Sequence, residues 1–298
     1  MSKTETEPST SYKLVEGDLK RLPSAFSPLT ETEHQTNWGR ELLVGESFAR
    51  KMDLYRAITA FNRALFLIPP ENKNRRLQIE YDIIFSYFLA GKCVDVLQAF
   101  EDSSLNRATP ENFPPFRDLL IMIHACYDQV EEFDKAEKVL KIIANGDSEL
   151  ANDIQLSIAV REGDIASAKA LAEHSNRKEP VLNFLEQYET QLKSPRRAQV
   201  LNAILPGAGY FYTGQYGTAV TSFLLNFLFI AATVTLFRKG NYALAIIFLS
   251  LEIGWYIGGI NGAGLAAKEW NEQIYNHLGT GMMTRNNLFP FLMLESAY

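Results

Sequence analysis

The chain is poor in the residues that build metal and redox centres. Among 298 residues it has only two cysteines and four histidines. The cysteines, Cys93 and Cys126, fit no zinc or redox spacing. We expect them to be buried thiols, with a disulfide between them as the alternative. None of the histidines pairs with another at metal-ligand spacing; they are His34, His124, His174 and His277. The sequence therefore predicts no metal site and no cofactor.

Basic charge and catalytic motifs are also missing. The chain carries 29 Lys and Arg against 35 Asp and Glu, a net charge of −6, which gives no electrostatic basis for binding nucleic acid. It has no Gly-x-Ser-x-Gly elbow and no His-Glu-x-x-His motif. Residues 209–214 have the glycine spacing of a phosphate-binding loop, but Gln215 and Tyr216 replace the Lys and Ser/Thr that would hold phosphate and magnesium. We expect no catalytic residues and no enzyme.

The first residues lack an apolar run. They are rich in Ser, Thr, Glu and Pro, so we expect no cleavable secretion signal. Residues 1–37 are predicted to form a solvated, disordered arm.

Long apolar runs are present near the other end of the chain. Residues 216–237 and 242–266 are each long enough to cross a bilayer core, which takes about 20 mostly apolar residues. Only Arg238, Lys239, Gly240 and Asn241 separate them. A helical hairpin would satisfy all backbone hydrogen bonds inside lipid. We therefore predict a membrane domain at residues 198–275, joined to the preceding part of the chain by a linking helix at residues 177–197.

Residues 38–176 read as successive helix pairs with one recurring register. Units begin at positions 45, 84, 124 and 156, and each shows bulky and small residues at the spacing of a helix-pair seam, with glycine at the turn in two of them. Each pair would leave an apolar face uncovered, so neighbouring pairs are expected to stack. The predicted repeat core comprises Gly45, Phe48, Leu54, Ala57, Phe61, Ala64, Tyr87, Gly91, Phe133, Ala136, Gly163 and Ala168.

The first of these units closely resembles a tetratricopeptide repeat. The later units do not keep the usual period of about 34 residues, so a looser helical solenoid and an ordinary helical bundle remain alternatives. The resemblance implies a scaffold that binds peptides or partner proteins in a concave groove. Carboxylate-binding candidates on first helices are Arg50, Lys51, Arg75 and Arg76, with solvated surface as the alternative for each.

A second resemblance concerns the residues before the first apolar run. The pattern Leu-Pro-Gly-x-Gly-x-x-Tyr-x-Gly, followed by two hydrophobic helices, resembles a small bacterial membrane domain of unknown function that is often found beside helical repeats. Tyr210 departs from it, since Gln is expected there in many relatives. The resemblance implies no activity. The motif residues are Leu205, Pro206, Gly207, Gly209, Tyr212 and Gly214.

The second apolar run carries a stripe of small residues and one acid. The stripe lets another helix approach closely, and its occupant is either the hairpin partner or a second copy of the chain; it comprises Gly254, Gly258, Gly262 and Ala266. Glu252 lies near the middle of the span, where a charge is costly. Asn226 lies at nearly the same depth, so we predict a hydrogen bond between it and the protonated carboxyl group of Glu252.

The C-terminal tail at residues 276–298 is predicted to start with a flexible link at Gly279, Thr280 and Gly281. Its apolar stretch at residues 288–294 could lie on the membrane or dock onto the solenoid, and nothing in the sequence decides between the two.

The sequence predicts an all-α protein: a tetratricopeptide-like solenoid followed by a two-helix transmembrane hairpin. We expect a non-enzymatic, membrane-anchored adaptor whose partners are a protein, membrane lipid and, as an alternative, a second copy of the chain, but no nucleic acid. Two alternatives are an accessory factor for membrane-protein insertion or envelope assembly, and a transport or proton-linked component that uses Glu252. Basic residues flank the outer ends of the hairpin more than its turn. They favour a bacterial inner membrane with the repeats in the cytoplasm.

Overall fold

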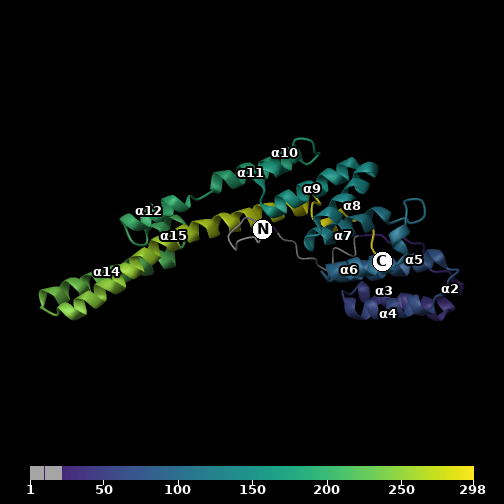
Figure 1. The fold of residues 1–298 in the computed structure, drawn as a ribbon, viewed down its shortest axis with the longest axis horizontal. Helices are drawn as coiled ribbons and strands as arrows, with labels where there is room; N and C mark the ends of the chain where they lie inside the picture. The colour runs from purple at the N-terminus through teal and green to yellow at the C-terminus, as the bar shows by residue number, and fades with distance from the viewer. Residues whose placement is uncertain (1–9, 11–21) are drawn as a thin grey trace. The chain divides into compact units, whose positions relative to one another are not determined.

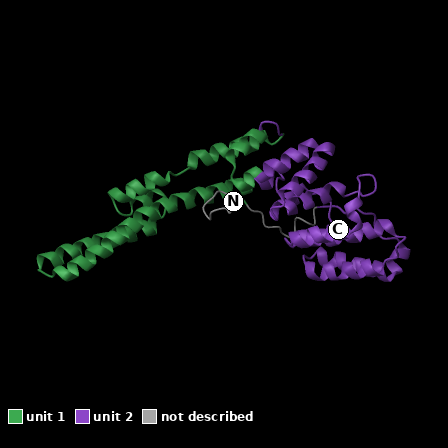
Figure 2. Cartoon of the chain, viewed as in Figure 1, with its two compact units in different colours: residues 1–11, 159–172, 176–282 green, residues 12–158, 173–175, 283–298 purple. Residues whose placement is uncertain are grey.

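The computed structural model describes residue 10 and residues 22–298, and over this part of the chain the fold is all-α. The described residues form no strand; a single parallel bridge links Ser24 and Ala297. The chain divides into two compact units (Figure 2). Among the described residues, unit 1 comprises residues 10, 159–172 and 176–282, and unit 2 comprises residues 22–158, 173–175 and 283–298. The predicted all-α class is confirmed, whereas the unit boundaries differ from the domain limits expected above.

Unit 2 contains consecutive helix pairs (Figure 1). Helices α3 and α4 pack on each other, as do α5 with α6 and α7 with α8, and α4 packs on α5. Their bounds are α3 (Asn37–Ala49), α4 (Leu54–Leu67), α5 (Lys73–Leu89), α6 (Cys93–Asp102), α7 (Phe116–Gln129) and α8 (Phe133–Gly146), with short helices α2 (Glu31–Gln35), η1 (Ser104–Arg107) and η2 (Pro290–Met293). Helix α9 (Ser148–Glu162) runs from unit 2 into unit 1, to which α10 (Ile165–Ala172) belongs.

The turns that follow α3, α5, α7 and α9 share one backbone feature. Met52, Gly91, Glu131 and Gly163 have φ angles of 60°, 67°, 63° and 73°, and each lies seven residues after the start of its unit. The left-handed region is favourable for glycine and costly for other residues. The sequence predicts such a turn where glycine occupies the position. Nothing in the sequence indicates the left-handed conformation at Met52 or Glu131.

The seam of the first pair is closely packed. Ala57, Phe61 and Ala64 are fully buried, and a Cβ atom on Gly45 would overlap the Phe61 ring. Phe133 differs from the expected core position: it is 61% exposed. Phe133 is the first residue of α8, and the buried residues of this helix, Ala136 and Ile143, come later in it.

Part of the expected disordered arm is ordered. Residues 1–9 and 11–21 lie outside the described residues, but residues 22–37 lie within them, and α2 forms there. Thr30 caps this helix, and Glu33 bonds back to the Thr30 backbone as a capping box. The Thr-x-x-Glu spacing was present in the sequence and should have limited the arm to the residues before it.

Cys93 and Cys126 form a disulfide instead of the expected separate thiols. Their Cα atoms lie 4.8 Å apart, and the bond links α6 to α7. The stacking of the second helix pair against the third brings the two residues together.

Unit 1 contains α11 (Lys178–Gln191), α12 (Pro195–Ile204), α13 (Ala208–Tyr212), α14 (Tyr216–Arg238) and most of α15 (Tyr242–Arg285). The predicted flexible link at residues 279–281 is wrong, because α15 continues through it. A Cβ atom on Gly279 would lie 2.6 Å from Thr10 Cγ2 and 3.3 Å from Phe184 Cζ. The glycine allows close packing between helices and does not end one.

Residues 288–298, termed the docked segment, lie in unit 2 with the helix pairs. Leu288, Phe289 and Leu294 are at most 4% exposed. Of the two positions left open by the sequence, the structure therefore places this apolar stretch with the helix pairs of unit 2.

Candidate functional site

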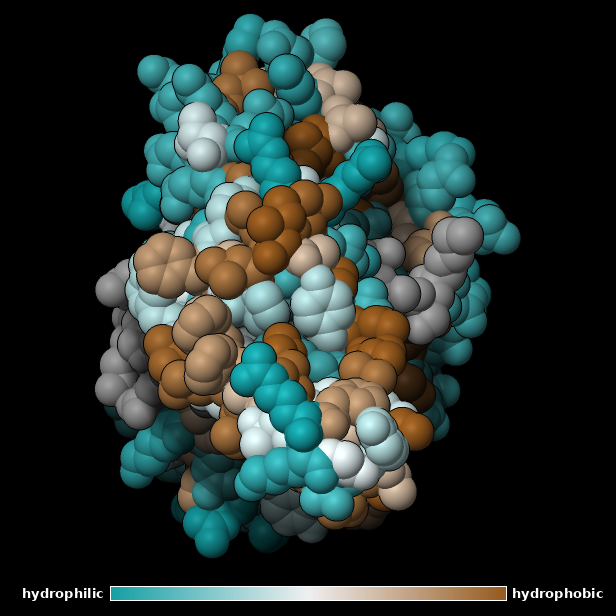
Figure 3. Space-filling view, turned by 90° about the vertical axis from the view of Figure 1, so that its left-hand side faces the viewer, coloured by the Kyte–Doolittle hydropathy of each residue, from teal (hydrophilic) through white to brown (hydrophobic). Residues whose placement is uncertain are grey.

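Two helices of unit 1 are long and apolar enough to cross a membrane, judged by length and composition. They are α14 and the helix that begins at Tyr242. A core helix of a soluble protein can pass the same test, but it would be mostly buried. Here only 17% and 11% of the respective apolar windows are buried. Figure 3 looks at the face that carries the loop between α14 and α15, and shows apolar side chains gathered around a few hydrophilic ones.

The Leu-Pro-Gly motif lies between α12 and α14, and its first two glycines permit close contacts. Gly207 has a φ angle of 92° and donates its N–H to Asn202 Oδ1 at 2.9 Å; a Cβ atom there would overlap the Ala219 carbonyl oxygen. A Cβ atom on Gly209 would overlap the Ala198 carbonyl oxygen and lie 2.7 Å from Ala263 Cβ. The motif therefore packs α13 against α12 and α15.

The end of the motif fixes the segment that leads into α12. Tyr212 accepts a hydrogen bond from Ser194 N at 3.1 Å. Asn271 holds Lys193 from both sides, accepting from its N–H at 2.8 Å and donating to its carbonyl at 2.9 Å. The Lys193 ammonium lies 3.5 Å from the centre of the Trp270 ring, a cation–π contact, and burial lowers its pKa. Sequence reasoning missed Lys193 and Asn271 as partners, because 78 residues separate them.

An apolar cleft of about 740 Å³ opens beside the motif. It is lined by Leu205, Pro206, Gly207 and Tyr212 of the motif and by apolar side chains of α12, α13 and α14, among them Leu201, Phe211, Val220 and Phe223. Its chemistry suits a hydrocarbon chain or the apolar side of another helix.

The small-residue stripe on α15 is only half covered. A Cβ atom on Gly262 would overlap the Tyr210 hydroxyl, and Ala266 is 5% exposed. Gly254 and Gly258 have nothing within 4 Å of an added Cβ. The hairpin partner therefore does not cover that end of the stripe. Gly259 faces both α12 and α14 instead, because a Cβ atom there would lie 3.2 Å from Asn202 Nδ2 and 3.9 Å from Ser222 Oγ.

Glu252 and Asn226 are both buried, but the predicted hydrogen bond between them is absent. Asn226 Nδ2 donates to the Ser222 carbonyl at 2.6 Å, inside its own helix. Bonding to the carbonyl four residues back is a common choice for short polar side chains. Asn226 Oδ1 and Glu252 Oε2 are left buried without a hydrogen-bond partner.

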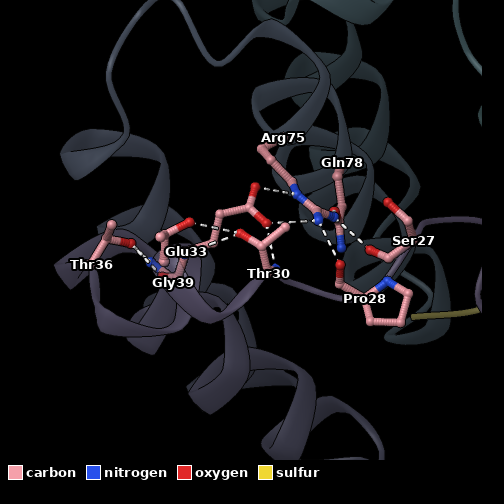
Figure 4. Close-up of polar contacts among 9 residues, drawn as sticks. Ser27, Pro28, Thr30, Glu33, Thr36, Gly39, Arg75 and Gln78 are labelled. Atoms are coloured by element: carbon pink, nitrogen blue, oxygen red, sulfur yellow. Dashed lines mark hydrogen bonds and ion pairs between the residues drawn. The ribbon is translucent and has the colours of Figure 1, made fainter.

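Of the candidate carboxylate-binding residues, Arg75 is fully engaged by the chain itself (Figure 4). Its guanidinium binds Glu33 through Nε at 2.9 Å, donates to the carbonyls of Ser27 and Pro28 at 2.7 and 2.9 Å, and reaches Gln78 Oε1 at 2.8 Å. Arg75 lowers the pKa of Glu33 to about 2. It therefore fastens residues 27–33 to α5.

The other candidates are arranged differently. Arg76 pairs with Glu80 at 3.5 Å and Arg50 with Glu46 at 3.9 Å, while Lys51 is exposed. Within the described part of the chain, no group of three or more His, Cys, Asp or Glu side chains could hold a metal ion.

Comparison of the chain with protein-family models, with curated proteins and with solved structures gave no match. The two family resemblances therefore remain predictions that rest on the residues alone.

Proposed function

We propose that this protein is a non-enzymatic adaptor that binds a protein partner through its helix pairs and is held at a membrane by the hairpin of α14 and α15. The observation that carries the proposal is the exposure of both apolar helices, since such surfaces are stable in lipid and aggregate in water. The stacked pairs of unit 2 supply an interaction scaffold of the tetratricopeptide-like kind.

The test uses the full chain in lipid nanodiscs. Proteins crosslinked to it in native membranes would be purified and their binding to the nanodiscs measured. We expect binding to fall when exposed apolar side chains of unit 2 are removed, as in Phe66→Ala and Phe133→Ala, which are 88% and 61% exposed. Equal binding to nanodiscs without the protein, or binding that is unchanged by every surface substitution of unit 2, would contradict an adaptor role for the repeats.

Two observations favour other roles for unit 1. The cleft of about 740 Å³ would suit an accessory factor that contacts client helices during membrane insertion. The buried, unpartnered oxygens of Glu252 and Asn226 would suit a proton-linked component. Glu252→Gln separates these roles, because an adaptor or an insertion factor keeps its activity and a proton-linked component loses it.

A further inference from the structure

Residues 294–298, the part of the docked segment after η2, are bound to unit 2 as an extended peptide is bound by a receptor. Arg117 Nη1 donates to the Met293 carbonyl at 2.8 Å. Asp118 Oδ2 accepts from the backbone N–H groups of Glu295 and Ser296 at 3.1 and 2.9 Å, and from the Ser296 hydroxyl at 2.6 Å. Most of these hydrogen bonds are made to backbone groups of the segment. Extended peptides of many sequences could therefore bind in the same register.

The opposite edge of the segment is paired as well. The Ala297 N–H donates to the Pro23 carbonyl at 2.8 Å, and Ala297 forms the parallel bridge with Ser24. Residues 293–297 are thus fixed between the start of α7 and the chain around Pro23. Backbone pairing on both edges is the arrangement expected of a binding site for one extended strand.

Tyr298 supplies the side-chain-specific contact. Its ring stacks on Phe61 with centroids 5.9 Å apart and lies 4.8 Å from that of Phe85, and it is 4% exposed. Its hydroxyl lies 2.8 Å from Ser86 Oγ. Because Ser86 already donates to the Asp82 carbonyl at 2.6 Å, the Tyr298 hydroxyl is the donor in this pair.

The pocket around Tyr298 contains a carboxyl group that the docked segment does not satisfy. Asp82 lies one helical turn before Ser86 on the same face of α5. It is fully buried, and neither carboxyl oxygen has a hydrogen-bond partner. Burial, together with Glu46 of α3, raises the pKa of Asp82 well above its usual range. An unpaired buried acid is costly, and a cationic partner would remove that cost.

We propose that the face formed by α5 and α7 is a binding site for an extended peptide, that residues 293–298 occupy it as a built-in competitor, and that the partner peptide carries Lys or Arg in the place of Tyr298, against Asp82. These side chains are about as long as Tyr and put a charge where its hydroxyl lies. The inference rests on the proposed adaptor function and adds its regulation and the chemistry of its partner.

The first experiment measures competition on the full chain in detergent. The probe is a fluorescent peptide with the sequence of residues 289–298, capped at both ends. We expect Tyr298→Ala to increase its affinity at least about tenfold over the wild-type chain, because a buried aromatic anchor is removed from the competitor. Tyr55→Ala is the matched control, since Tyr55 is 84% exposed, and should leave the affinity unchanged. Equal binding to all three chains would overturn the competitor role.

Ser296→Pro provides a second variant should Tyr298→Ala disturb the fold, which circular dichroism would show. It removes both the N–H and the hydroxyl group that Ser296 donates to Asp118, and it leaves Tyr298 in the chain. Tighter peptide binding by this variant supports the inference, and wild-type affinity contradicts it.

The second experiment tests the basic residue. A peptide with Lys in the place of Tyr298 should bind the Tyr298→Ala chain about tenfold more tightly than the Tyr peptide. Adding Asp82→Asn should abolish that preference. A preference for the Tyr peptide, or a Lys preference that survives Asp82→Asn, would overturn the proposed partner chemistry.

The outcomes also separate this inference from the adaptor function. A crosslinked partner that binds wild-type and Tyr298→Ala chains equally would leave the adaptor intact and exclude the docked segment as its competitor. Peptide results as expected, with no partner captured by either chain, would leave the binding site intact and contradict the adaptor.

Discussion

At the scale of single residues, a left-handed residue recurs in the turns that follow α3, α5, α7 and α9. Its position follows from the sequence register, because Gly91 and Gly163 lie at equivalent offsets. Its use at Met52 and Glu131 could not be predicted, because residues with a Cβ atom rarely adopt a positive φ. There the packing of the two helices sets the turn, and the local preference is overridden.

Gly91→Ala should therefore destabilise unit 2 by about 1–2 kcal/mol. A Cβ atom at Gly91 meets nothing within 4 Å, so the cost is that of the backbone conformation alone. Gly146→Ala is the matched control: it also has open space but no positive φ, and it should be neutral or slightly stabilising. Urea unfolding of the full chain in detergent, followed by circular dichroism, measures both. Equal midpoints for the two variants would contradict the shared-turn interpretation.

The ion pair between Arg75 and Glu33 holds residues 27–33 on α5 in a pH-dependent way. The pKa of Glu33 is about 2 in the folded chain, below its ordinary value of 4.5. A carboxyl group of this kind stabilises the fold above pH 4.5, and the contribution is lost as the pH falls towards 2.

Arg75→Ala should cost about 2 kcal/mol at neutral pH, typical for losing hydrogen bonds to a charged group, and should flatten the dependence of stability on pH between about 4.5 and 2. Arg63→Ala serves as the control. The Arg63 side chain is 67% exposed, so its ion pair with Glu41 is expected to contribute little to stability. Denaturant midpoints across this pH range give the measurement. A steep acid dependence retained by Arg75→Ala would contradict the assignment.

At the scale of helices, apolar patterning located most elements. The expected spans at 216–237 and 242–266 correspond to α14 and the first part of α15, and the helix pairs begin and end near their predicted turns. The prediction of a flexible link at residues 279–281 was wrong, because a glycine can either end a helix or allow another element to pack closely against it. The contact with Phe184 decides between them, and a single sequence does not reveal such long-range neighbours.

The glycines of the Leu-Pro-Gly motif allow a matched test. Gly209→Ala should destabilise unit 1 by about 1–3 kcal/mol, because the added methyl group overlaps the backbone of α12. Gly217→Ala should have little effect, since nothing lies within 4 Å of its Cβ position. Thermal unfolding of the detergent-solubilised chain compares them. A Gly209→Ala chain as stable as Gly217→Ala would show that the motif does not act through close packing.

At the scale of the whole molecule, the sequence indicated two kinds of unit but not which segments each contains. The docked segment joins unit 2 through Asp118 and Ser296, which lie 178 residues apart. No periodic pattern in the sequence indicates such a contact, because each of the two residues, taken alone, could equally be an ordinary polar surface residue. The role of Arg75 was hidden for the same reason, since its partner Glu33 lies in a segment taken to be disordered.

Membrane integration is the central claim, and extraction of native vesicles with alkaline carbonate tests it most directly. If α14 and α15 are embedded in lipid, the full chain stays with the vesicles on flotation and leaves them only in detergent. Release of the chain by carbonate, as a monodisperse protein without detergent, would contradict the account.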